Sequence, residues 1–98
     1  MGTWAVKVYG EAVIAKFAKK RAASRKPLQR FLEIVKQANW LHFADVKCTF
    51  GSADYVAGRL VFDIGGNKYR LIASVDFNEQ ILVVDQVMTH EEYAREKL

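Results

Sequence analysis

Two adjacent glycines, Gly65 and Gly66, divide the most strongly patterned part of this sequence into two extended runs. Residues 60–64 and residues 67–77 are both rich in β-branched and aromatic side chains. Two such runs joined by a glycine pair are typical of an antiparallel β-hairpin with a two-residue turn. The hairpin is therefore the element around which the rest of the chain has to fold.

The predicted hairpin has one charged face and one apolar face. Side chains alternate across a strand, so Lys68 and Arg70 share a face. A two-residue turn places Asp63 opposite Lys68 and brings Arg59 to the same side of the sheet. The other face carries the apolar residues Leu60, Phe62, Ile64, Tyr69 and Leu71. That apolar face requires a covering layer, and the charged face is left for solvent or a ligand.

The segment before the hairpin predicts one strand and two helices. Residues 4–9 are short and rich in β-branched and aromatic side chains, which indicates a strand. Apolar residues at helical spacing give residues 11–21 and 27–39 one apolar face each. Pro27 suits the first turn of the second helix, where its missing N–H is not needed. These two helices are the expected cover of the sheet.

The segments that flank the hairpin differ in how clearly they are patterned. Residues 40–57 are weakly patterned, with Asp45 capping one short turn before a loop. Residues 80–88 are almost wholly apolar, which is typical of a strand buried on both faces. Thr89 has the position of a helix N-cap, and Glu92 completes a capping box that begins a terminal helix reaching about residue 97.

The resulting order, β-α-α-β-β-β-α, predicts an α+β fold with two helices on one face of a mainly antiparallel four-stranded sheet. At 98 residues the chain is expected to form a single domain, residues 1–98. No apolar run is long enough for a membrane span and no signal peptide opens the chain, so a cytoplasmic location is expected. Cys48 is the single cysteine, and the two histidines lack metal-ligand spacing, so neither a metal nor another cofactor is expected.

Charge is distributed unequally along the chain. Residues 1–48 contain ten lysines and arginines against three acidic residues, whereas residues 49–98 contain five against eight. Such a basic half is typical of a protein that approaches a polyanion or an acidic partner, although a solvated helix face is the commoner explanation. The basic residues of the two predicted helices are Lys16, Lys19, Lys20, Arg21, Arg25, Lys26 and Arg30.

The charged face of the hairpin has two interpretations. Cross-strand ion pairs such as Asp63–Lys68 on a solvated sheet surface are the more common use of these residue types. Alternatively, Arg70 can fork onto two phosphate oxygens while Lys68 adds a point charge beside it. The second interpretation makes this face a phosphate site, and the pattern alone leaves both open.

His90 and Tyr93 form a second candidate cluster at the start of the terminal helix. They lie three positions apart and so share a helix face. The positive end of the helix dipole favours a neutral imidazole, which accepts a proton near pH 7 while a tyrosine hydroxyl donates or orients one. In the structural alternative, which is the more common one, Tyr93 closes the edge of the core and His90 only begins the helix.

The sequence resembles one known family over residues 7–93. The Gly-Asn-Lys-Tyr-Arg-Leu core at 66–71, the surrounding stretch 53–71 and the Thr-His-x-x-Tyr segment at 89–93 resemble the HigB toxins of the RelE superfamily. The resemblance implies a RelE-like fold and an endoribonuclease that cleaves mRNA, often on the ribosome, without a metal. It also implies a HigA-type antitoxin with a helix-turn-helix, through which any contact with DNA is indirect.

The resemblance also implies roles for particular residues. Lys68 and Arg70 are expected to stabilise the pentavalent phosphorane, and His90 and Tyr93 to share the acid and base work of a 2′-OH attack that leaves 2′,3′-cyclic phosphate and 5′-OH ends. The resemblance assigns Arg59 and Asn67, less strongly, to holding RNA. Lys19 and Lys20 are expected to hold RNA because of their charge in the basic segment, and not because of the resemblance.

Two residues depart from the family pattern. Asp63 stands where many relatives have asparagine, and Met88 replaces the usual glycine before Thr-His. A carboxylate opposite Lys68 lowers phosphate affinity or holds the lysine, and Met88 alters the turn that aims His90. These departures keep an alternative open, in which the chain binds RNA or antitoxin without cleaving.

Overall fold

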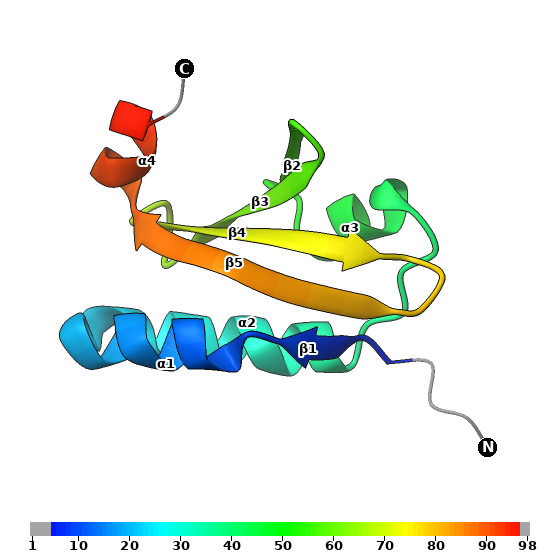
Figure 1. The fold of residues 1–98 in the computed structure, drawn as a ribbon, viewed down its shortest axis with the longest axis horizontal. Helices are drawn as coiled ribbons and strands as arrows, with labels where there is room; N and C mark the ends of the chain where they lie inside the picture. Colours follow the sequence, from blue (N-terminus) through cyan, green and yellow to red (C-terminus); the bar gives the residue numbers. More distant parts are fainter. Residues whose placement is uncertain (1–4, 97–98) are drawn as a thin grey trace.

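The computed structural model describes residues 5–96, which form one sheet with helices against it (Figure 1). Trp4 and residue 97, which the sequence placed in the first strand and the last helix, lie outside the described residues. The five strands are β1 Lys7–Tyr9, β2 Asp54–Val56, β3 Arg59–Ile64, β4 Tyr69–Asp76 and β5 Ile81–Thr89. The helices are α1 Glu11–Lys20, the 3₁₀ turn η1 Ala22–Ser24, α2 Arg25–Lys36, α3 Phe43–Thr49 and α4 His90–Glu96.

The sheet has the strand order β1-β5-β4-β3-β2. The α+β class and the mainly antiparallel sheet are confirmed, but β1 pairs parallel with β5, and the predicted number of four strands is wrong. The additional strand is β2, which has three exposed residues and pairs with β3. A strand is predicted from alternating buried and exposed residues, and β2 is too short and too exposed to show that alternation. Among residues 5–96, no helix is both long and apolar enough to cross a membrane.

Helix α3 was predicted only as one short turn. It spans seven residues, and the cap position belongs to His42 instead of Asp45. Asp45 lies within the first turn of α3, where its carboxylate accepts a hydrogen bond from the Leu41 N–H at 2.8 Å. The predicted role of Asp45 as the cap is therefore wrong, although it still satisfies a backbone donor at this end of the helix.

Helices α1 and α2 pack on one face of the sheet, as the apolar spacing predicts (Figure 1). The buried side chains Leu28, Phe31 and Val35 of α2 lie against the core. The chain can turn from β1 into α1 because Gly10 has φ +88°, and a Cβ at that position would lie 2.7 Å from the Val84 carbonyl oxygen. Only glycine combines this backbone conformation with such a close approach to β5.

The turn of the hairpin is longer than predicted. Gly65, Gly66 and Asn67 have φ of 65°, 63° and 84°, so three consecutive residues adopt the left-handed region. Glycine and asparagine are the residues that tolerate this conformation best. The loop consequently contains residues 65–68, and the first strand pair beyond it is Ile64 with Tyr69.

The longer turn changes the register of the hairpin but not its faces. Asp63 pairs with Arg70, so the predicted pairing of Asp63 with Lys68 is wrong. Val61 correspondingly pairs with Ile72, whereas a two-residue turn would place Arg70 opposite it. A shift of two residues returns each side chain to the face predicted for it, because side chains alternate with a period of two. The charged residues of β3 and β4 therefore remain on the face opposite to α1 and α2.

Strand β5 is not buried on both faces as its composition predicted. Val83 is 39% exposed while Leu82 and Val84 belong to the core, which is the alternation of a strand covered on one side. An irregularity opposite Ile72 and Ala73 interrupts the pairing of β4 with β5. Beyond it Met88 pairs with Arg70, so a buried apolar side chain lies beside the arginine on the outer face.

Candidate active site

The two motifs singled out in the sequence meet at one end of the sheet. Strands β4 and β5 pair as far as Tyr69 and Thr89, and the next backbone hydrogen bond runs from the His90 N–H to the Lys68 carbonyl at 2.8 Å. Lys68 is the last residue of the hairpin loop and His90 is the first residue of α4. Both side chains are exposed, so this corner offers an imidazole and an ammonium group to solvent.

Arg70 is the centre of the buried part of this corner. Its Nη1 donates to the carbonyl oxygens of Asn67 at 3.3 Å and of Tyr69 at 3.2 Å. Its Nη2 donates to the Asn67 side-chain Oδ1 at 2.6 Å, and the Tyr93 ring lies 5.8 Å from the guanidinium carbon. Arg70 thus connects the hairpin turn to α4, which explains how a charged residue can be only 8% exposed.

Asp63 provides the countercharge of Arg70. Its Oδ1 lies 3.1 Å from the Arg70 Nε, and its side chain is 30% exposed against 10% for the arginine. The carboxylate was expected to hold Lys68, and the corrected register gives it Arg70 instead. Two of the three guanidinium nitrogens therefore donate hydrogen bonds to the hairpin turn, and the third, Nε, forms an ion pair with Asp63.

The capping box at the start of α4 is confirmed. The Thr89 N–H donates to Glu92 Oε1 at 2.9 Å, and the Glu92 N–H donates to Thr89 Oγ1 at 3.1 Å. The backbone hydrogen bond from Thr89 is the largest of the interactions that lower the pKa of Glu92, with smaller contributions from the Thr89 hydroxyl, Arg21 and Arg95. This reciprocal pair fixes the first turn of α4, from which both His90 and Tyr93 project.

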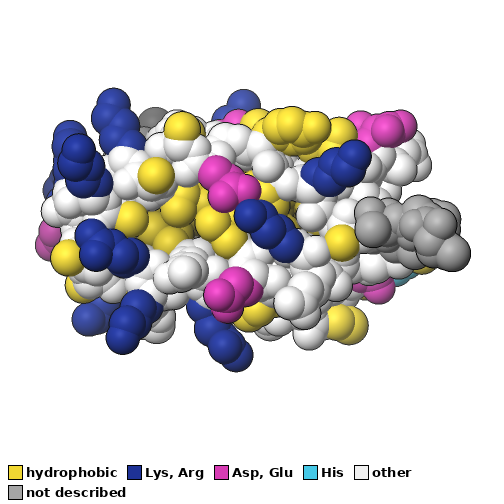
Figure 2. Space-filling view, turned by 90° about the horizontal axis from the view of Figure 1, so that it is seen from below, with side chains coloured by type: hydrophobic (Ala, Val, Ile, Leu, Met, Phe, Trp, Pro, Cys, Tyr) yellow, Lys and Arg dark blue, Asp and Glu magenta, His cyan; other side chains and the backbone are white. Residues whose placement is uncertain are grey.

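A second contact attaches α4 to the basic end of α1. Arg21 Nη2 lies 3.9 Å from Glu92 Oε2, and the Arg21 guanidinium lies over the Phe17 ring at 5.3 Å. Lys19 and Lys20, which were predicted to hold RNA, are exposed in the last turn of α1 beside it. Figure 2 shows lysine and arginine side chains gathered most densely at this end of the helical side of the molecule. The basic segment therefore borders the corner that holds Lys68 and His90.

The side chains of two residues predicted to hold RNA, Arg59 and Asn67, have partners within the protein. Arg59 lies on the outer face, but at the opposite end of β3, about 13 Å along the strand from Asp63. Its Nε forms an ion pair with Asp85 at 3.5 Å, and Ser74 donates to the same carboxylate at 3.1 Å. Asn67 is in the hairpin turn, where its side-chain oxygen serves Arg70. The structure thus gathers Lys68, Arg70, His90 and Tyr93 but leaves Arg59 apart from them.

Two contacts of this corner were not predicted correctly from the sequence. The sequence identified Arg21 only as one of several basic residues of the predicted helices. Its contact with Glu92 cannot be predicted from a local pattern, because the two residues are far apart in the sequence. Asp63 was noticed, but its partner was misassigned. The signal that would have corrected it is the Gly-Gly-Asn sequence, because three residues that accept positive φ indicate a loop longer than two.

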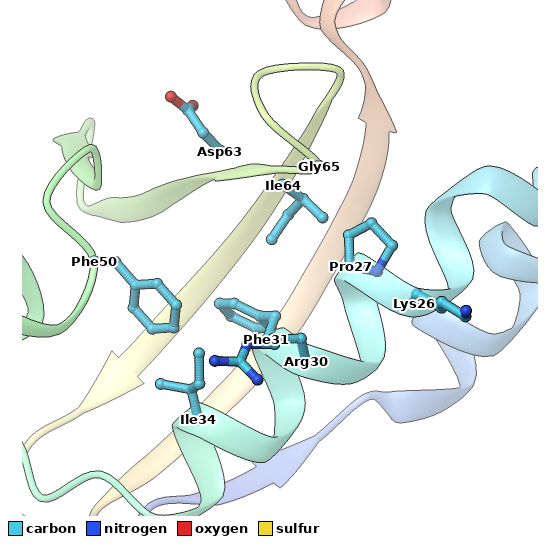
Figure 3. A pocket seen from close by; sticks show the side chains of 9 residues that line it. All are labelled: Lys26, Pro27, Arg30, Phe31, Ile34, Phe50, Asp63, Ile64 and Gly65. Carbon is cyan, nitrogen blue, oxygen red and sulfur yellow. The ribbon is translucent and has the colours of Figure 1, made fainter.

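A hollow of about 410 Å³ lies on the other side of β3, between that strand and α2 (Figure 3). Its lining is mainly apolar and includes Phe31, Ile34 and Phe50; the charged lining residues are Lys26, Arg30 and Asp63. The Asp63 carboxylate points away from these side chains. No histidine or tyrosine of the described residues lines the hollow, so the corner with Arg70, His90 and Tyr93 is the better candidate for catalysis. Within the described part of the chain, no cluster of three or more histidine, cysteine or acidic side chains is arranged to hold a metal ion.

Comparison with known proteins gives a consistent assignment. A family model described as the RelE-like toxic component of a toxin–antitoxin system, HigB toxin, matches residues 24–96. Over 90 residues the chain is 36% identical to the mRNA interferase toxin HigB of Escherichia coli strain K12, with 83% of this chain and 86% of the relative covered. Identity and coverage are the same for the mRNA interferase HigB of Escherichia coli O157:H7 and of Shigella flexneri. The chain therefore belongs to the HigB family of RelE-like toxins.

Proposed function

We propose that this chain is the toxin of a toxin–antitoxin system and acts as an mRNA endoribonuclease that inhibits translation. Family membership and the names of its relatives support this role. The structural observation that carries it is the hydrogen bond from the His90 N–H to the Lys68 carbonyl. This bond joins a strand motif that offers cations to a helix motif that offers proton-transfer groups, and phosphoryl transfer needs both.

In the proposed reaction, the ribose 2′-OH attacks the adjacent phosphorus and the bond from phosphorus to O5′ breaks. A base removes the proton of the 2′-OH, and an acid supplies one to the departing O5′. We assign these two tasks to His90 and Tyr93 together. Arg70 and Lys68 stabilise the charge that develops on the phosphorane, and the products carry a 2′,3′-cyclic phosphate and a 5′-OH. No step of this scheme uses a metal ion or other cofactor.

The partners follow from the same proposal. Lys19 and Lys20 lie at the basic end of the helices and draw the RNA backbone towards the corner, in a manner that weakens as salt rises. We propose that the substrate is mRNA in the cytoplasm, cleaved mainly on the ribosome. The inhibitor is a HigA-type antitoxin with a helix-turn-helix, and only through it does the toxin approach DNA.

The experiment that tests this function uses purified chain with RNA alone and with translating ribosomes. We expect RNA fragments with 2′,3′-cyclic phosphate and 5′-OH ends, identified by end-specific ligation and mass spectrometry. Arg70→Ala is the catalytic control, and Lys7→Ala, an exposed lysine on β1, is the surface control. Intact RNA in both assays, with no change in mRNA lifetime when the chain is induced in a bacterium, would refute the proposed activity.

One observation favours a second function, a module that binds RNA or antitoxin without cleaving. All three nitrogens of the Arg70 guanidinium contact oxygens of the protein, one of them a carboxylate oxygen, so fewer of its five N–H groups remain for a phosphate. Binding of non-cleavable RNA or of antitoxin, together with intact substrate RNA, is the result expected of such a module. Detection of cyclic phosphate ends excludes it.

A further inference from the structure

The acceptors around Arg70 are not equivalent. Three of its hydrogen bonds go to backbone or side-chain oxygens of residues 67 and 69, which belong to the hairpin turn and the first residue of β4. These acceptors are neutral and their positions are set by the turn. Asp63 is the only anion among the described partners of Arg70, and its side chain is three times as exposed as that of the arginine.

A carboxylate beside the Arg70 Nε imitates the substrate. Arginine recognises carboxylates and phosphates in the same way, by placing N–H donors on anionic oxygens. The Asp63 oxygen, 3.1 Å from Nε, therefore occupies a position that a phosphate oxygen would take. A phosphate that approaches Arg70 meets a cation already compensated and a negative charge beside it, and both effects weaken binding.

We propose that Asp63 is an internal competitor of the RNA phosphate at Arg70 and sets how tightly this site holds its substrate. The inference rests on the proposed ribonuclease function. On binding, the phosphate displaces the Asp63 carboxylate, which turns towards solvent, while the Asn67 and Tyr69 oxygens keep the guanidinium in place. Asp63 is thus a residue that tunes affinity, and the contacts of the turn are the ones that position Arg70.

The test compares Asp63→Asn with the matched variant Asp85→Asn. Asparagine keeps the size of Asp63 and an oxygen for Nε but removes the charge. Asp85 is a similar control because it also forms an ion pair with an arginine, Arg59, on the same face but away from the corner. Binding is measured by fluorescence anisotropy with an RNA oligonucleotide whose 2′-OH groups are all methylated, and cleavage is measured with the unmodified oligonucleotide.

We expect Asp63→Asn to lower both the Kd for the methylated RNA and the KM for cleavage about tenfold, with kcat changed less than about twofold. The slope of log Kd against log salt should steepen by about 0.7, the value for one additional phosphate contact on a single strand. Asp85→Asn should leave all of these quantities unchanged. Asp63→Ala, which also removes the charge, should tighten binding as well and serves if the asparagine variant does not fold.

Two results would overturn the proposal. Weaker binding or a lower kcat in Asp63→Asn would show that the carboxylate positions Arg70. Unchanged affinity would show that the carboxylate neither competes with the phosphate nor positions Arg70. Failure of the ribonuclease function is distinguishable, because neither the wild type nor the variant would then cleave RNA. The affinities for methylated RNA still decide whether Asp63 competes.

Discussion

Arg70 and His90 belong to the same candidate site but are held in opposite ways. The Arg70 side chain is buried and has hydrogen bonds to the hairpin turn, an ion pair with Asp63 and a ring over it. The His90 side chain is exposed, and the residue is placed through its backbone N–H. The site therefore has a part fixed by packing, which suits the stabilisation of charge, and a part open to water, which suits proton exchange.

This difference predicts that removal of Arg70 damages both activity and stability. Arg70→Ala should lower kcat/KM at least about a thousandfold, because a preorganised donor to the developing charge is lost. It should also lower the free energy of unfolding by about 2 kcal/mol, since the turn loses its hydrogen bonds and Asp63 loses its countercharge. RNA cleavage kinetics and urea unfolding measure the two effects.

Arg70→Lys is the informative comparison for this prediction. Lysine keeps the charge beside Asp63 but cannot reach the carbonyl and side-chain oxygens of the turn together. We expect it to recover part of the stability and little of the activity. If Arg70→Ala cleaves RNA as fast as the wild type, the fixed part of the site has a structural role alone.

His90→Ala should affect activity without affecting stability. Removal of a general acid or base lowers kcat by about a hundredfold or more, whereas loss of an exposed side chain changes the free energy of unfolding by less than about 0.5 kcal/mol. His42, the other histidine of the chain, is exposed at the start of α3 and provides the matched control, His42→Ala. An equal loss of activity in the two variants would contradict the role of His90.

Lys68→Ala tests whether the open part of the site also supplies charge. The side chain is exposed, and its residue contacts α4 through the backbone carbonyl. We expect kcat/KM to fall about tenfold, with unfolding unchanged, because one cation near the phosphate is lost while Arg70 remains. Lys7→Ala, an exposed lysine on β1, is the matched control. A clear loss of stability in Lys68→Ala would show that this lysine belongs to the part of the site that is fixed by packing, as Arg70 does.

The contrast between the two parts also explains how far the sequence could predict the site. Residues that act locally were identified correctly: the capping box of Thr89 and Glu92 has the predicted geometry, because both partners lie within one helical turn. The register of the hairpin was predicted wrongly, since two adjacent glycines were interpreted as a complete two-residue turn. Asn67 also adopts positive φ, which lengthens the turn. The cross-strand partner of Asp63 is therefore Arg70 instead of Lys68.

The fold was predicted where periodic burial dictates it and missed where it does not. Helices α1 and α2 each have one apolar face, and both were found with small errors at their ends. Strand β2 has three exposed residues, and its existence depends on backbone pairing with β3. The parallel pairing of β1 with β5 likewise depends on how α1 and α2 return the chain across the sheet, which no local pattern encodes.

The smallest expected effect concerns the capping box that lies between the two parts. Thr89→Ala removes the hydroxyl that accepts the Glu92 N–H and should lower the free energy of unfolding by about 1 kcal/mol. Activity should fall only slightly, because the Glu92 side chain still accepts from the residue-89 N–H. Thermal unfolding with parallel cleavage assays measures both effects.

The pH dependence of this cap follows from Glu92. The backbone N–H of Thr89 is the main cause of the lowered pKa of Glu92, so the folded protein favours the ionised carboxylate. The resulting stabilisation is fully present above about 4.3, the ordinary pKa of glutamate, and is lost as the pH falls through the lower pKa of the folded state. Glu92→Gln should therefore be less stable than the wild type near neutral pH, and the difference should shrink in acid. A difference that stays constant across this range would show that the charge of Glu92 contributes nothing to the stability of the fold.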